Sequence, residues 1–189
     1  DWNKIPEHKQ NNGICSLGND YYGGDLEGII KKLPYLKELG VTCIYLNPIF
    51  EAHSNHRYNT ADYMKVDPVL GTNEDFKEVC ENLHAAGIRV ILDGVFNHCG
   101  SFHRWLDREK IYRNTGNYPP GAYGRRDSEY QSYFDFQKDQ WPDNDSYESW
   151  WGFSSLPKLN YEQSMQLRDE ILRVAAKWVS PPYNADGWR

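Results

Sequence analysis

The chain has 189 residues, enough for a domain with a buried core, and its 15% aromatic content excludes a disordered polypeptide. A net charge of −6 argues against a nucleic-acid partner. The sequence has no apolar run of membrane-spanning length and does not open with a signal peptide, so we expect no membrane partner. Four widely separated cysteines without C-x-x-C spacing favour a reducing, cytoplasmic setting over secretion.

The N-terminal part predicts one interrupted helix. Residues 1–24 are polar and rich in glycine and asparagine. Apolar residues then recur at spacings of three and four over 25–39, which predicts an amphipathic helix. Pro34 must divide this helix into two pieces, and Gly40 lies where a left-handed cap is expected.

A strand, a polar loop and a second helix are expected next. The apolar run 41–46 predicts a buried strand that includes Cys43 as a small hydrophobic residue, and residues 50–71 predict a polar loop. Thr72 and Asp75 resemble a capping box. The helix that they open is expected to bury Phe76, Val79, Cys80 and Leu83.

The second half contains a long segment of different composition. Residues 88–96 predict a second buried strand. The segment 99–163 then holds about half of all aromatic residues but few aliphatic ones, which indicates an inserted subdomain. Ser164 is a candidate N-cap, and residues 185–189 start a third strand. The helix between them is expected to use one face, formed by Leu167, Ile171, Leu172, Ala175 and Trp178.

Apolar strands that alternate with amphipathic helices predict a parallel α/β sheet. An open doubly wound sheet and a (β/α)₈ barrel share this pattern. A complete barrel needs about 250 residues and eight strands. If the fold is a barrel, the three strands of this chain form only a part of it.

Polar residues cluster where the second strand ends, which is where parallel α/β folds bind ligands. Asp93, Asn97 and His98 lie there, the charged and aromatic loop 54–63 follows the first strand, and Arg189 ends the third. Arg189 is a suitable partner for Asp93 because a guanidinium binds a carboxylate with two parallel donors. A purely structural ion pair and an ordinary loop histidine are equally good explanations of these residues alone.

Taken together, the motifs resemble the α-amylase family. Six occur in that family's order: Tyr22-Gly23-Gly24-Asp25-Leu26, Gly40-Val41 through Asn47-Pro48, the Asn55-to-Tyr63 loop, Asp93-Gly94-Val95-Phe96-Asn97-His98, Leu156-Pro157-Lys158-Leu159-Asn160 and Gly187-Trp188-Arg189. The Pro-Lys-Leu-Asn stretch is similar to the neopullulanase, cyclomaltodextrinase and maltogenic amylase branch. The resemblance implies an N-terminal part of a (β/α)₈ catalytic barrel, with strands two to four at 1–98 and 164–189. Residues 99–163 would be the domain inserted after the third strand.

The resemblance also implies roles for individual residues. Tyr58 would stack on the sugar ring at the cleavage subsite, and His98 would hydrogen-bond that sugar's hydroxyls. Arg189 would support the nucleophile, and Asp93 would hold the hydrogen-bond network of the pocket. Asn97 would order the insertion, in some members through calcium.

Two further groups of residues have expected roles. Gly23 and Asp25 resemble two ligands of a calcium site of this branch, whose other ligands would precede residue 1. Calcium is the one cofactor that the resemblance implies. Trp150 and Trp151 are candidates for platforms that stack α-glucan, and the core of the insertion is the alternative position for them.

The implied activity is hydrolysis of α-glucans such as starch, maltodextrin, cyclodextrin and pullulan at α-1,4 bonds, with retention. The family's nucleophilic aspartate would come two residues after Arg189 and its acid glutamate later, so the catalytic carboxylates are expected outside these residues. We therefore expect this chain to be inactive alone. The alternative is a non-catalytic family member that binds carbohydrate or supports a partner protein. Open barrel edges predict self-association.

Overall fold

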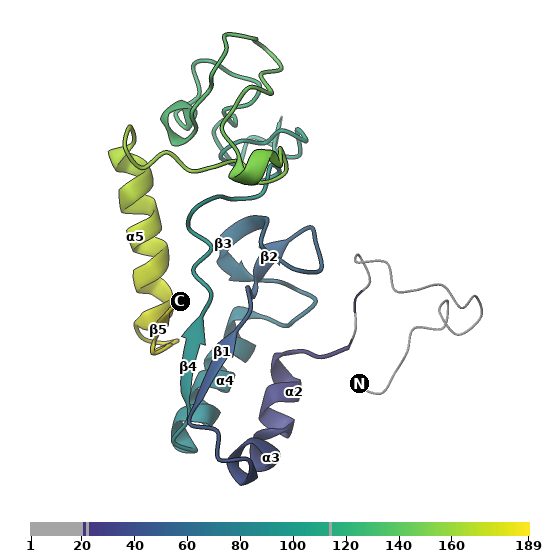
Figure 1. Cartoon of the computed structure of the whole chain (residues 1–189), viewed down its shortest axis with the longest axis vertical. Coiled ribbons are helices and arrows are strands. Elements are labelled where there is room, and N and C mark those ends of the chain that lie inside the picture. Colours follow the sequence, from purple (N-terminus) through teal and green to yellow (C-terminus); the bar gives the residue numbers. More distant parts are fainter. Residues whose placement is uncertain (1–20, 22, 114) are drawn as a thin grey trace, which may run out of the picture.

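The computed structural model describes residues 21, 23–113 and 115–189. Strands and most helices occupy one end of an elongated molecule, the segment after β4 forms the other end, and α5 runs along the side (Figure 1). The elements are α2 (Leu26–Lys31), α3 (Leu33–Glu38), β1 (Cys43–Leu46), β2 (Phe50–Ala52), β3 (Thr60–Val66), α4 (Asn73–Ala85), β4 (Arg89–Leu92), η1 (Gln131–Tyr133), η2 (Trp150–Gly152), α5 (Met165–Val179) and β5 (Gly187–Trp188).

The interrupted first helix is confirmed. Asp25 caps α2 by accepting a hydrogen bond from the amide of Gly28 at 2.8 Å. The helix ends at Lys31, and Pro34 lies in the first turn of α3, where its missing N–H costs no helical hydrogen bond. Gly40 follows with a φ of 77°, the left-handed conformation expected of a glycine cap.

Both longer helices begin at the predicted caps. The Thr72–Asp75 capping box is present, and α4 buries the four residues expected of it. Ser164 accepts from the amide of Leu167 and opens α5. Leu172 was expected on the buried face but is 66% exposed. The residues of α5 that are buried instead follow one another at spacings of four, three and four: Leu167, Ile171, Val174 and Trp178. In the described part of the chain, no helix has both the length and the apolarity that a membrane span requires.

The three predicted strands form one parallel sheet in the order β1-β4-β5. Val90 and Leu92 point to the helix side and are buried. Cys43 and Tyr45 point to the other side, which no element of the described chain covers, and both are exposed. The expectation that Cys43 is buried was therefore wrong, because every second residue of β1 faces this open side.

Two local features differ from the sequence-based expectations. The predicted loop at 50–71 contains an antiparallel hairpin of β2 and β3, whose irregular register weakened its alternating pattern. The second strand ends at Leu92 rather than Phe96. The amide of Gly94 still donates to the carbonyl of Arg189, which continues the parallel pairing, and the chain then turns where the amide of Phe96 donates to the carbonyl of Gly94.

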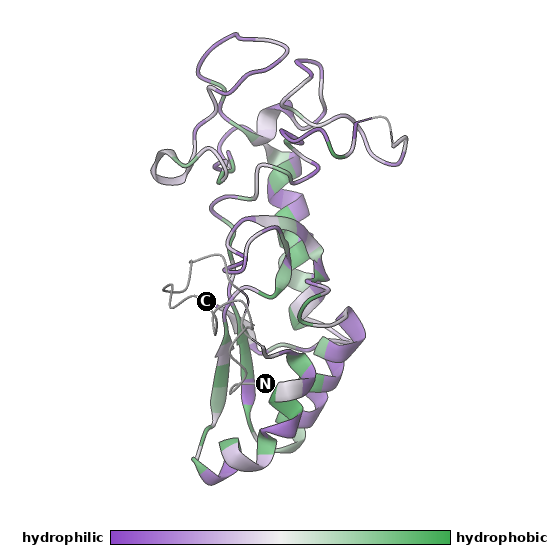
Figure 2. Cartoon of the chain, turned by 90° about the vertical axis from the view of Figure 1, so that its right-hand side faces the viewer, coloured by the Kyte–Doolittle hydropathy of each residue, from purple (hydrophilic) through white to green (hydrophobic). Residues whose placement is uncertain are grey.

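Aromatic rings join α5 to the hairpin and to α4. Trp178 is fully buried, with its ring 5.0 Å from Phe50, 5.6 Å from Phe76 and 4.7 Å from Tyr183 between centroids. Its indole N–H donates to the carbonyl of Tyr63 at 2.9 Å. Figure 2 shows the apolar strands and the apolar faces of the helices around this core. Truncation of such a side chain costs about 3–5 kcal/mol.

The segment 99–163 has little regular structure, consisting of loops and the short helices η1 and η2. It buries aromatic residues of its own, including Trp105 and Tyr133. Its end returns to the sheet, where the amide of Leu159 donates to the carbonyl of Asn97 at 3.0 Å. This return places the insertion directly above the carboxyl end of β4.

Candidate active site

The carboxyl ends of the three parallel strands bring Tyr45, Asp93 and Arg189 together on the open side of the sheet. Asp93 is only 6% exposed, and its Oδ2 accepts from the hydroxyl of Tyr45. Arg189 Nη1 lies 3.7 Å from the same oxygen and 3.3 Å from the Tyr45 hydroxyl. The pairing of Arg189 with Asp93 that sequence reasoning expected is present. The arginine itself is mostly exposed, so the buried carboxylate depends more on the Tyr45 hydroxyl than on the ion pair.

Tyr58 reaches Asp93 from the loop between β2 and β3. Its hydroxyl donates to Asp93 Oδ2 at 3.0 Å, although the two residues are 35 positions apart. Burial, followed by the bond to Asp93 and its negative charge, raises the pKa of Tyr58 to about 12. The phenol therefore stays neutral and keeps donating to Asp93 throughout the physiological range. The loop is held by buried Arg57, which has a φ of 60° and pairs with Asp67 at 3.2 Å.

His98 has a defined protonation state because both of its ring nitrogens have protein partners. Its Nε2 donates to the carbonyl of Tyr58 at 3.0 Å, and its Nδ1 accepts from the Asn97 side chain at 3.2 Å. Burial lowers the pKa of His98, so the ring is neutral at pH 7. Tyr63 fixes the turn by donating to the carbonyl of His98 at 2.7 Å.

A cavity of about 430 Å³ opens between this loop and the insertion. This volume lies within the range of about 300–1,000 Å³ that is typical of small-molecule sites. The lining of the cavity is aromatic with neutral polar groups and contains no carboxylate: His56, Tyr58, Asn59, His98, Trp150, Phe153, Ser155 and Leu156. Flat rings beside amide and hydroxyl groups suit a ligand with apolar faces and a hydroxyl edge.

The glycosidase mechanism needs two carboxyl groups about 5–9.5 Å apart around the scissile bond. Asp93 is engaged by Tyr45, Tyr58 and Arg189, and no Asp or Glu of the described residues lines this cavity. The site as described can therefore hold a ligand but lacks a general acid and a nucleophile.

Gly23 and Asp25 do not form a metal site by themselves. One carboxylate oxygen of Asp25 accepts the capping hydrogen bond of α2. Among the residues that the structure describes, no three His, Cys, Asp or Glu side chains are grouped to hold an ion. Calcium thus stays a prediction that depends on ligands beyond these two residues.

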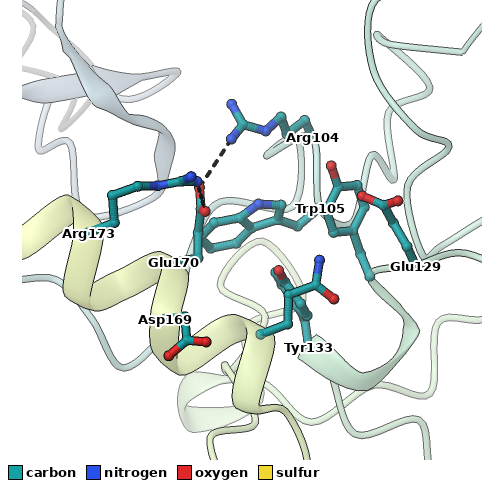
Figure 3. Close-up of a pocket in the computed structure, with 9 residues that line it drawn as sticks. Arg104, Trp105, Glu129, Tyr133, Asp169, Glu170 and Arg173 are labelled. Carbon is teal, nitrogen blue, oxygen red and sulfur yellow. Dashed lines mark hydrogen bonds and ion pairs between the residues drawn. The ribbon is translucent and has the colours of Figure 1, made fainter.

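A larger cavity, of about 620 Å³, lies away from Asp93 between α5 and the insertion (Figure 3). Its central charge is Glu170 of α5, which pairs with Arg104 of the insertion at 3.4 Å and with Arg173 one turn along the helix. The Glu170 side chain is only 13% exposed. Glu170 therefore connects the insertion to α5 through Arg104, and this cavity is best explained as the ionic junction between them.

Sequence reasoning missed Tyr45 as a member of the site. The available signal was its place as the next-to-last residue of the first strand, on the same side of the sheet as the strand-end cluster. The suggestion that Trp150 and Trp151 form the core of the insertion is wrong, since they are 41% and 83% exposed. Phe153 was not singled out either, although it lines the cavity with Trp150.

Comparison with known proteins agrees with this geometry. Residues 7–189 match the model of the alpha amylase catalytic domain. An amylopullulanase of Thermoanaerobacterium saccharolyticum is 38% identical over the whole chain, which covers 16% of that protein. An intracellular maltogenic amylase of Bacillus subtilis is 37% identical over 99% of the chain, which covers 29% of that protein.

The fold agrees as well. The cyclic α-maltosyl-(1→6)-maltose hydrolase of Arthrobacter globiformis, solved in complex with maltose, superposes with a TM-score of 0.75 at 35% identity. The match covers 99% of this chain and 39% of that one. The three-stranded sheet is thus part of a (β/α)₈ barrel, as predicted. Among the relatives that the chain resembles are amylopullulanases, maltogenic amylases and cyclomaltodextrinases. The chain belongs to the α-amylase family.

Proposed function

We propose that a polypeptide containing this chain hydrolyses α-1,4-glucosidic bonds with retention, and that these residues supply the part of its site that holds a glucosyl unit. The observation that carries the proposal is the Tyr58–Asp93 hydrogen bond, which fixes an aromatic ring at the wall of a carboxylate-free cavity. The family supports glucan as the substrate class. In this arrangement Tyr58 stacks on the sugar, His98 meets its hydroxyls, Asp93 and Arg189 order the strand ends, and Asn97 attaches the insertion.

We further propose that the 189-residue chain alone has no hydrolytic activity, because none of the described residues that line its cavity is a carboxylic acid able to serve as acid or nucleophile. The test incubates the purified chain with cyclodextrin, pullulan and starch and measures reducing ends, while calorimetry measures maltose binding in parallel. We expect binding without hydrolysis. Reducing ends above a host-protein blank would show that the assigned roles are wrong.

A non-catalytic, carbohydrate-binding role is the second candidate, since the described lining of the cavity provides rings and neutral polar groups that suit sugar binding without catalysis. Within the chain, Tyr58→Ala discriminates glucan binding from a purely structural role. This variant should lose maltose binding, whereas Tyr35→Ala on α3, a tyrosine that is 51% exposed, should bind as the parent does. Equal binding by both variants would show that the loop containing Tyr58 does not bind glucan.

Three other expectations remain proposals. We infer a reducing compartment, because Cys43, Cys80 and Cys99 are all free thiols. The open edges of the sheet favour self-association, which light scattering can measure. Calcium should raise the melting temperature if Gly23 and Asp25 belong to a complete site, and no shift with added Ca²⁺ would reject it for this chain.

A further inference from the structure

Tyr45 contacts both charged groups at the strand ends. Its hydroxyl donates to Asp93 Oδ2 and accepts from Arg189 Nη1, which lies 3.3 Å away. The guanidinium carbon of Arg189 also lies 5.4 Å from the centre of the Tyr45 ring, which is within the range of a cation–π contact. Both the ring face and the hydroxyl of one tyrosine therefore hold the guanidinium.

The direct contact between Arg189 and Asp93 is loose by comparison. Nη1 of Arg189 lies 3.7 Å from Asp93 Oδ2, whereas a charge-assisted hydrogen bond between such groups is about 2.7–2.9 Å long. The hydroxyl groups of Tyr45 and Tyr58 already donate to this oxygen. The Tyr45 hydroxyl thus takes a place at Oδ2 that an N–H group of Arg189 would otherwise take, and the guanidinium stays outside hydrogen-bond distance.

This position leaves most of the Arg189 donors available. A guanidinium carries five N–H donors. Among the residues that the structure describes, neither Nε nor Nη2 of Arg189 has a hydrogen-bond partner, and the side chain is 68% exposed. The backbone of Arg189 is fixed, since its amide donates to the carbonyl of Leu92 at 2.8 Å and its carbonyl accepts from the amide of Gly94 at 2.9 Å. The side-chain torsions of Arg189, and the groups that the guanidinium meets, therefore decide where these donors point.

We propose that Tyr45 is a positioning residue whose hydroxyl prevents Arg189 from closing on Asp93, so that the free guanidinium donors can bind a second carboxylate. This inference rests on the proposed function, which requires carboxylates that the described lining of the cavity does not supply. Asp93 is 6% exposed, and a buried carboxylate that loses a hydrogen-bond donor is costly. Without the Tyr45 hydroxyl, Arg189 is the donor that replaces it, and an arginine paired with Asp93 presents fewer donors to a second carboxylate.

The first test uses the 189-residue chain and does not depend on activity. NMR of labelled arginine side chains measures the rate of rotation about the Nε–Cζ bond of Arg189, with Arg189→Lys to assign its signal. In Tyr45→Phe, which keeps the ring, we expect this rotation to slow at least about threefold, because the guanidinium closes on Asp93. Tyr58→Phe is the matched control, since it removes a donor from the same oxygen but not the hydroxyl that Arg189 contacts, and its rate should stay near that of the parent. An unchanged or faster rotation in Tyr45→Phe would overturn the proposal, as would slowing that persists when Asp93→Asn is added.

The second test measures hydrolysis of maltoheptaose by a polypeptide that continues through the catalytic carboxylates expected after Arg189. Tyr45→Phe should lower kcat about ten- to hundredfold and change KM less than about threefold, because the substitution alters how Arg189 is held and not how the sugar binds. In the Asp93→Asn background the same substitution should have little further effect on kcat, because Arg189 then has no carboxylate to close on. Independent losses from the two substitutions, or a rise in KM alone, would contradict the positioning role. A parent polypeptide that hydrolyses no glucan would reject the proposed function, and the rotation rate of Arg189 would then decide the role of Tyr45 separately.

Discussion

The hydrogen bond between Tyr58 and the buried carboxylate of Asp93 offers a direct test of how the site is held. Tyr58→Phe removes the donor and keeps the ring. A hydrogen bond to a charged group contributes about 1.5–3 kcal/mol. Tyr58 is half-buried and Asp93 keeps the Tyr45 donor, so we expect the lower part of this range, about 1.5–2.5 kcal/mol. For a chain of this size, that loss lowers the melting temperature by about 3–10 °C.

A double-mutant cycle isolates the pair. Tyr58→Phe, Asp93→Asn and the double variant are unfolded by heat and by urea, and the coupling energy should be about 1–2 kcal/mol. Tyr35→Phe on α3 controls for the loss of an exposed hydroxyl and should change stability by less than about 0.5 kcal/mol. Additive effects of the two site substitutions would refute the reasoning.

The same cycle has an electrostatic readout. Asp93 contributes to raising the pKa of Tyr58 to about 12, after burial as the larger cause. Asp93→Asn removes the negative charge and should therefore lower this pKa toward the ordinary value of 10. NMR titration of ring-labelled tyrosines, with Tyr58→Phe to assign the signal, measures it. An unchanged pKa in Asp93→Asn would show that the 3.0 Å contact does not exist in solution.

Other predictions concern stability. Glu170→Ala should lower the free energy of unfolding by about 1–3 kcal/mol, because it leaves Arg104 and Arg173 without their shared carboxylate. The control Asp169→Ala, on the same helix, should lower it by less than about 0.5 kcal/mol in thermal melts, and equal losses would contradict the ionic junction. Removing the capping box with Thr72→Ala should cost about 1 kcal/mol in urea unfolding, and no loss would show that the cap is dispensable. The pKa values of Tyr58 and of other buried tyrosines are raised in the folded state, so these hydroxyl groups lose their protons first in the unfolded state. Stability should therefore fall as the pH rises from about 10 to about 12. A urea midpoint that stays constant over this range would refute the prediction. At acidic pH a buried histidine of the insertion should have the corresponding effect. Burial holds the pKa of His103 well below 6.5, so stability should fall as the pH drops below that value. The loss of stability should be smaller in His103→Gln.

The helix boundaries could be predicted because the interactions that set them are local. The capping box at Thr72, the cap at Ser164 and the break before Pro34 each involve atoms within about four residues, so the sequence contains both partners. The same is true of the left-handed Gly40. The parallel order of the strands followed from their alternation with helices, and this order alone was enough to expect Arg189 beside Asp93.

The hairpin of β2 and β3 could not be predicted in this way. Its register shifts twice within three pairs, so the alternating pattern that identifies a strand is missing from the sequence. The burial of Cys43 was misjudged for a related reason. An apolar run shows that a strand exists, but which of its two faces is covered depends on neighbouring elements.

The sequence by itself determined the caps, the helix breaks, the strand order and the family, because these depend on neighbours along the chain or on motifs in a fixed order. Only the tertiary structure decided that Tyr45 and Tyr58 share one oxygen of Asp93, across 48 and 35 residues. It also decided that Trp150 and Trp151 face the solvent beside the cavity rather than the core of the insertion. Burial and long-range hydrogen bonds depend on how the elements pack against each other. The spacing of residues along the sequence does not determine that packing.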